Sequence, residues 1–141
     1  MEGSLDLDAA GANLLRVMLL QDTTIEAFEP DDANVTALLA GGNTEVTVTS
    51  YARQTLASPV VTNNGTLNRA EASGNVTTFT GLETGETVAA ANVNEQIGGS
   101  DVDGNDPPLA WFDLTDTPTN NGDIEIRWDT GTVSGDWMRL T

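Results

Sequence analysis

Most of the chain after residue 42 alternates between apolar and polar positions with a period of two, as half-buried β-strands do. In residues 44–51, TEVTVTSY, the apolar Val46 and Val48 stand between threonines. Gly or Asn separates the later runs, and Asn63–Gly65 reads as a turn between two strands. The later strand-like runs are residues 58–61, 67–72, 75–82 and 87–97. This pattern predicts an all-β fold, an antiparallel β-sandwich of the jelly-roll or immunoglobulin-like kind.

The segments before residue 42 follow other patterns. Residues 9–20 contain LLRVMLL, which fits a helix or a strand with two apolar faces, and we favour a strand. Residues 29–42, EPDDANVTALLAGG, predict one short helix of about three turns near residues 30–40. Glu29 would cap it, Pro30 would take the first helical position, and Gly41-Gly42 would end it. The apolar residues on its one face are Val35, Leu38 and Leu39.

Residues 108–131, PLAWFDLTDTPTNNGDIEIRWDTG, predict two strands joined by a turn. The first, PLAWFDL, is apolar on both faces, which is typical of a central strand. In the second, Ile124, Ile126 and Trp128 alternate with charged residues, so these three should face the core. The Asn120-Asn121-Gly122 stretch tolerates positive φ and predicts a hairpin turn between the two strands.

The length of 141 residues suits a single domain spanning 1–141, in which residues 1–12 could form an N-terminal arm. The start, MEGSLDLD, is acidic where a signal peptide would be basic. The longest apolar run, around LLRVMLL, is too short to span a bilayer. The sequence therefore predicts a soluble chain that is not exported and does not enter a membrane.

The strongly negative net charge favours some interpretations of the chain over others. The chain has 22 acidic residues and five basic ones, all arginine, for a net charge of -17. Acidic disorder does not fit the strong strand patterns, and a nucleic-acid mimic remains an alternative. Adaptation to molar salt is favoured, because at about 1 M salt the Debye length falls to roughly 3 Å and self-repulsion is screened. Binding to nucleic acid is not expected, since no basic patch could neutralise phosphates.

Composition also limits catalysis. The chain has no His, Cys or Lys, which removes Ser-His-Asp and Cys-His triads, Schiff-base chemistry, and zinc sites built from His or Cys. A pair of carboxylates of the glycosidase type remains, but among 22 acids some pair falls at a suitable spacing by chance. We therefore predict no enzymatic activity, no catalytic residue and no organic cofactor.

One acidic loop is a candidate cation site. In GGSDVDGNDPP, the residues Asp101, Asp103, Asn105 and Asp106 offer oxygen ligands of the kind that Ca²⁺ or another hard cation prefers. The match to an EF-hand loop is partial, because Asp106 stands where the turn glycine belongs and no Glu occupies the twelfth place. The alternative is a solvated acidic loop that serves solubility.

The three tryptophans could form a sugar-binding platform, but Trp111 and Trp128 lie in apolar strand patterns, so core packing is the prediction for both. Trp137 is the one expected to be partly exposed or at an interface. The three N-x-Ser/Thr sequons, at Asn34, Asn64 and Asn75, are about what chance gives in a chain so rich in Asn, Ser and Thr.

The ordered blocks of the sequence resemble a family of small virion structural proteins of tailed double-stranded DNA viruses. In that family the blocks are a Tyr-x-Arg-Gln-x-Leu motif and a late Asp-x-Thr-Asp-x-Pro-x-Asn-Gly-Gly-Asp motif followed by a strand that ends in Trp. The matching residues are Tyr51, Arg53, Gln54 and Leu56, then Asp113, Thr115, Asp116, Pro118, Asn120, Asp123 and Trp128. The resemblance covers most of the chain from about Leu14, whereas the loop before PLAWFDL and the C-terminal end look extended.

The resemblance implies a structural role in the virus particle, and the absence of Lys and the net charge suggest a haloarchaeal host. We expect a head decoration or turret component on the particle exterior, made in the host cytoplasm at high salt. Its partners would be copies of itself and the major capsid protein or other virion proteins. Alternatives are a tail or neck component of the same particle and a carbohydrate-binding or cell-surface module.

Arg53 is a lone cation beside a strand in a very acidic chain. We predict that it pairs with a carboxylate such as Asp113 or Asp116 and so fixes a loop. The alternative is an exposed arginine that contributes little.

Overall fold

The computed structural model describes residues 13–23, 31–65, 69–128 and 136–140, and the following elements lie within them. The strands before the long central one are β1 (Leu14–Gln21), β2 (Gln54–Thr55), β3 (Val60–Asn64), β4 (Arg69–Ser73) and β5 (Thr77–Leu82). The rest are β6 (Thr87–Gln96), β7 (Pro108–Pro118), β8 (Gly122–Ile126) and β9 (Asp136–Leu140), with helix α1 (Val35–Ala40) and the 3-10 turn η1 (Ile97–Gly99). The predicted all-β, antiparallel sandwich-like fold is confirmed.

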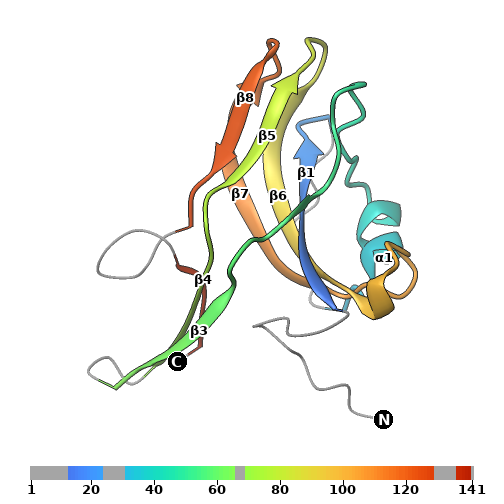
Figure 1. Ribbon diagram of the computed structural model, residues 1–141. Helices are drawn as coiled ribbons and strands as arrows, with labels where there is room; N and C mark the ends of the chain where they lie inside the picture. Colours follow the sequence, from blue (N-terminus) through green and yellow to red (C-terminus); the bar gives the residue numbers. More distant parts are fainter. Residues whose placement is uncertain (1–12, 24–30, 66–68, 129–135, 141) are drawn as a thin grey trace.

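Two layers enclose the main core. A four-stranded sheet in the order β2-β1-β6-β7 forms one layer, and the β5-β8 pair forms the other (Figure 1). Leu15, Val17 and Leu19 of β1 project between the layers and pack with Phe79 of β5 and Trp128 after β8. All are almost fully buried, which explains why these apolar positions recur with period two. These two layers, with α1, are called the body below.

The two central strands of the large sheet are buried on both faces. β1 and β6 pair antiparallel along their whole length, with Val17 opposite Val93. Strand β6 is buried from Val88 to its end. On the second face of the sheet, Met18 and Leu20 of β1 and Ala90 of β6 pack against helix α1. The residues of α1 that they meet are Val35 and Leu38. Helix α1 thus acts as a cover for the face of the sheet that points away from the other layer (Figure 1).

The helix is shorter than the sequence predicts. It begins after Asn34, whose side-chain Oδ1 accepts a hydrogen bond from the Ala37 N–H at 2.9 Å. The predicted cap at Glu29 was wrong, because Asn34 takes that role; Pro30 and Glu29 lie outside the described residues. The predicted end is confirmed, since Gly41 caps the C-terminus and Gly42 adopts φ 123°.

A third sheet, β3-β4-β9, projects from the body as an arm (Figure 1). The predicted strand-turn-strand lies in this arm, to which β9 is added, but the turn was placed too early, because Asn63 and Asn64 pair with β4 as part of β3. At its root Ala72 joins the main core, and Leu56 packs there as well. Gly74 lies so close to Leu56 that a Cβ would meet its Cδ1 at 2.6 Å, so the backbone and the buried leucine fix the direction in which the arm leaves.

Two expectations about strand pairing were wrong. Residues 44–51 form no regular strand; their only ladder contact in the described chain is one bridge between Glu45 and Leu20. β7 is not central but lies at the edge of the four-stranded sheet. It needs apolar residues on both faces because Phe112 packs into the main core while Trp111 packs beside α1.

The turn after β7 does not make a hairpin either. β7 pairs with β6, whereas β8 crosses to the other layer and pairs with β5. The Asn120-Asn121-Gly122 turn has the predicted positive φ, 65° at Asn121. However, the Asn121 N–H donates to the Leu82 carbonyl, so the turn joins two layers. The predicted inward residues Ile124, Ile126 and Trp128 do face the core.

Candidate functional site

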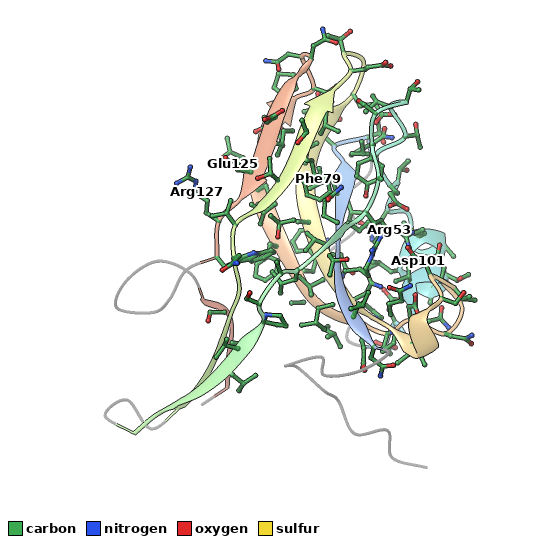
Figure 2. All side chains as sticks on the ribbon, in the orientation of Figure 1. Arg53, Phe79, Asp101, Glu125 and Arg127 are labelled. Atoms are coloured by element: carbon green, nitrogen blue, oxygen red, sulfur yellow. The ribbon has the colours of Figure 1, made fainter. Side chains whose placement is uncertain are left out.

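Arg53 is the centre of the densest polar cluster in the described part of the chain, which we call the Arg53 cluster: Arg16, Glu45, Tyr51, Arg53, Asp101 and Asp103. It brings together β1, the segment before β2, and the loop after η1. Figure 2 shows Arg53 and Asp101 side by side next to α1. These elements are distant in sequence, so the cluster ties the loop to the large sheet.

The Arg53 guanidinium is held by three carboxylates. Its Nε and Nη2 donate to the two oxygens of Glu45 at 2.7 and 2.6 Å, a two-pronged contact. Its Nη1 donates to Asp103 at 2.5 Å and to Asp101 at 3.0 Å. The Arg53 side chain is only 11% exposed. The hydrogen bond to Glu45 is the main reason that the pKa of Arg53 is raised above its ordinary value, and burial opposes this.

The prediction that Arg53 pairs with a carboxylate is confirmed, but the predicted partners were wrong. Asp113 and Asp116 lie on the exposed outer part of β7. Asp113 stands opposite Ala90 in the ladder, away from Arg53. The actual partner is Glu45, which lies beside β1 in residues 44–51. Arg53 follows Glu45 by eight residues in the chain.

Arg16 and Tyr51 extend the cluster toward the sheet. Arg16 donates to the Arg53 carbonyl at 2.9 Å and lies 3.6 Å from Asp101. The Tyr51 hydroxyl donates to Glu45 at 2.8 Å and accepts from the Leu19 N–H at 3.1 Å. Burial, and then the charge of Glu45, raises the pKa of Tyr51 well above its ordinary range. The Tyr51 ring stacks on Phe79 with centroids 5.8 Å apart, so the cluster joins the main core.

In the acidic loop predicted as a cation site, three of the four predicted ligand side chains already accept hydrogen bonds from protein donors. Asp101 and Asp103 are bound to Arg53. Asp106 is fully buried, and its two oxygens accept hydrogen bonds from the N–H groups of Ile97 and Val102 at 2.9 and 3.2 Å. Asn105 is exposed.

In this arrangement the carboxylates of Asp101, Asp103 and Asp106 are all held by protein donors. Among the described residues, no group of three or more acidic side chains is placed to hold a metal ion. The loop instead supports α1, because the Asp106 and Asp103 carbonyls accept from the N–H groups of Val35 and Thr36 at 2.9 and 3.1 Å. Metal bound to this loop stays a prediction that metal analysis after dialysis against a chelator would test.

Two of the three predicted placements of tryptophan are described. Trp128 is buried in the main core, where its Nε1 donates to Thr77 at 3.3 Å and its ring meets Phe112 edge-on. Trp111 is half-buried against the α1 side of the sheet. Core packing is thus confirmed for both, and neither forms a flat exposed platform. Trp137 lies in β9, of which only the backbone is described.

Two buried amides on the α1 side of β6 were not predicted from the sequence. Asn92 and Asn94 are fully buried there, and Asn92 donates through Nδ2 to the Ala110 carbonyl at 3.0 Å. Asn94 stands opposite Arg16 in the ladder, next to the Arg53 cluster. An alternation of Asn with Val in ANVN looks like an ordinary half-exposed strand, and the burial of these amides is set by tertiary packing that the local pattern does not show.

The cluster joins three segments of the chain through charged contacts. Its two guanidinium groups and three carboxylates largely offset one another and leave one formal negative charge. No helix in the described ranges is long and apolar enough to cross a membrane. Comparison of the chain with protein-family models, with curated proteins and with solved structures found no match.

Proposed function

We propose that the chain is a capsid-associated structural protein of a haloarchaeal tailed virus, a head decoration or turret component that assembles as a symmetric oligomer. The observation that carries the proposal is the contrast in charge between the projecting arm and the body. The arm has two arginines, Arg69 and Arg139, and two acids, Glu71 and Asp136, so its formal charges cancel. The net charge of -17 therefore lies wholly on the rest of the chain.

This distribution suits a part that assembles in strong salt. An acidic body stays hydrated and soluble when repulsion is screened, and a neutral arm can approach another acidic protein without a Coulomb penalty. The Arg53 cluster and the tightly packed core give the body a rigid frame. Together with the family resemblance of the Tyr51–Leu56 and Asp113–Trp128 blocks, these features support a role in a particle and no catalytic role.

Salt dependence tests assembly. The purified chain should sediment as an oligomer at about 3 M KCl and dissociate on dilution to about 0.1 M, because copies with acidic bodies repel once screening is lost. Circular dichroism at both salt concentrations, at equal protein concentration, separates dissociation from unfolding. An oligomer indifferent to salt, or a monomer at every salt concentration, contradicts the proposal.

Location in the particle needs a second experiment. Mass spectrometry of purified particles should detect the chain in a fixed ratio to the major capsid protein. A particle reconstruction should then place its density on the head exterior. Density at the tail or neck would keep the virion role and move the protein, whereas absence of the chain from particles contradicts the role itself.

A further inference from the structure

The edge strand β3 of the arm is the surface that the body leaves open. β3 pairs with β4 on one side, and on its other side no strand of the described chain lies beside it. Such an edge presents a row of unpaired N–H and C=O groups, which a further strand can satisfy. Val60 and Val61 are 46% and 41% exposed, and as neighbours in a strand they point to opposite faces.

The two edges of the arm differ in how they are protected. β9, the opposite edge, carries Asp136 and Arg139, and its register with β4 shifts at Ala72/Ser73. Charges and bulges of this kind discourage pairing with another chain. β3 pairs with β4 in an unbroken register and contains no charged residue. It lies within residues 54–68, which form the longest uncharged stretch of the sequence.

We propose that β3 is a self-association edge, on which β3 of a second copy pairs antiparallel about a two-fold axis. The two arms then form one continuous sheet in the order β9-β4-β3-β3-β4-β9. This inference rests on the proposed function, since it names the surface through which copies of the assembling protein meet. An antiparallel pair of identical strands is self-complementary, as an isologous interface requires.

Charge selects a second copy as the occupant. A basic partner would be drawn to the acidic body and would gain nothing from a neutral arm. An acidic partner is repelled by the body and can approach closely only where charge is missing, and the chain itself is such a partner. The exposed valines would supply apolar cross-strand pairs at the junction. Two five-residue strands bury little area, so we expect a weak contact that many copies on one particle reinforce.

The chain has no cysteine, so a single introduced cysteine reports one contact alone. We would place one cysteine at each position of β3 in turn, from Val60→Cys to Asn64→Cys, with Val76→Cys as the matched control. Val76 is 48% exposed and lies outside β3, beyond the end of β4. Mild oxidation at about 3 M KCl should give disulfide-linked dimers at the one or two β3 positions nearest the two-fold axis, and few at residue 76. Equal cross-linking at residue 76, or none at any β3 position, overturns the inference.

Val61→Lys tests the same edge without oxidation. It places like charges close together in both copies and should weaken self-association by roughly tenfold, because the change acts twice in a symmetric dimer. Val76→Lys should leave association unchanged. The melting temperature of the dilute, monomeric Val61→Lys chain should equal that of the unaltered chain. A fall in that temperature would mean that the edge is covered within one chain, which overturns the inference.

The outcomes separate the two proposals. An oligomer that persists in Val61→Lys, with no cross-link along β3, contradicts the pairing edge and leaves the structural role standing. A chain that is monomeric at about 3 M KCl and missing from particles contradicts the proposed function itself.

Discussion

The arm and the body are both antiparallel β-structure, yet they are stabilised in different ways. The body buries leucines, valines and Phe79 between two layers and fixes its loop with the Arg53 cluster (Figure 2). The arm consists of three short strands whose valines remain exposed, and among its described side chains Ala72, at the root, belongs to the main core. The formal charges of the arm cancel, so the whole net charge of -17 lies on the rest of the chain. The difference teaches that the chain separates a packed, ion-paired frame from an exposed, formally neutral projection, and the proposed self-association rests on that separation.

The largest expected effect is in the core of the body. Phe79→Ala removes a fully buried ring that also stacks on Tyr51, and it should lower the free energy of unfolding by about 3–5 kcal/mol. Urea denaturation in concentrated KCl, followed by tryptophan fluorescence, would measure it. Val76→Ala, at an exposed site, serves as the control. If both changes had the same cost, the distinction between a packed core and an exposed periphery would be lost.

The next effect concerns the Arg53 cluster. Arg53→Met keeps the apolar stem and leaves Glu45 and Asp103 without their cation, while Asp101 keeps only the longer contact with Arg16. We expect a loss of about 2–3 kcal/mol, seen as a lower melting temperature in molar KCl. The matched control is Arg127→Met, because Arg127 is 74% exposed and pairs only with Glu125 at 2.6 Å among the described residues. That control should change stability by about 0.5 kcal/mol or less. Equal effects at the two arginines would contradict a structural role for the cluster.

Tyr51→Phe should cost about 1 kcal/mol at neutral pH, because Leu19 and Glu45 each lose a hydrogen-bond partner. It should also change the pH profile. The folded chain keeps the phenol protonated above its ordinary pKa of about 10, so stability is fully present below about pH 10 and falls as the pH rises further.

The chain offers a clean measurement of this effect. Tyr51 is its single tyrosine and it has no Lys or Cys, so no other side chain titrates in its ordinary range between about pH 9 and 11. Melting temperatures over that range should decline in the unaltered chain and stay level in Tyr51→Phe. Parallel declines in both would show that the hydroxyl is not the cause.

The smallest effect is expected in the arm. Val61→Ser should alter the free energy of unfolding of the monomer by about 0.5 kcal/mol or less, because the side chain is largely exposed. Thermal melts at low protein concentration would check this value. A loss as large as that of Arg53→Met would place the arm in the stable frame and would remove the contrast between the two parts.

Local patterns predicted the strands well where burial alternates along one segment. β5 and β6 lie within the predicted runs, and β1, β4 and β8 each extend one residue beyond theirs. Ile124, Ile126 and Trp128 face the core, as predicted. The patterns failed where pairing decides the outcome. The apolar residues on both faces of β7 suggested a central strand. They do not reveal that β7 lies at the edge of the sheet, with one face packed beside α1. Likewise, the Asn-Gly turn sets a local bend, but the pairing of β8 with β5, which begins beside the hydrogen bond from Asn121 to Leu82, places β8 in the other layer.

The candidate site was predicted in part. Sequence singled out Arg53 and, separately, the acidic loop at Asp101 and Asp103, but it assigned them to different contacts. Their meeting depends on residues 44–53 lying beside β1 and on the loop after η1 folding back against them, and neither is a local property of the chain. Sequence could have suggested the meeting, since an acidic loop that needs a cation and an isolated arginine satisfy each other.

The Arg53 cluster affects how far the structure of the loop depends on dissolved cations. Acidic surfaces of such chains depend on dissolved cations, which exchange rapidly and vary with the medium. In the loop at Asp101 and Asp103, the positive charge is the guanidinium of Arg53, which is part of the chain and is not lost on dilution. The geometry that supports α1 is therefore insulated from the choice between potassium and sodium, and from their concentration, while the outer carboxylates remain free to respond to both.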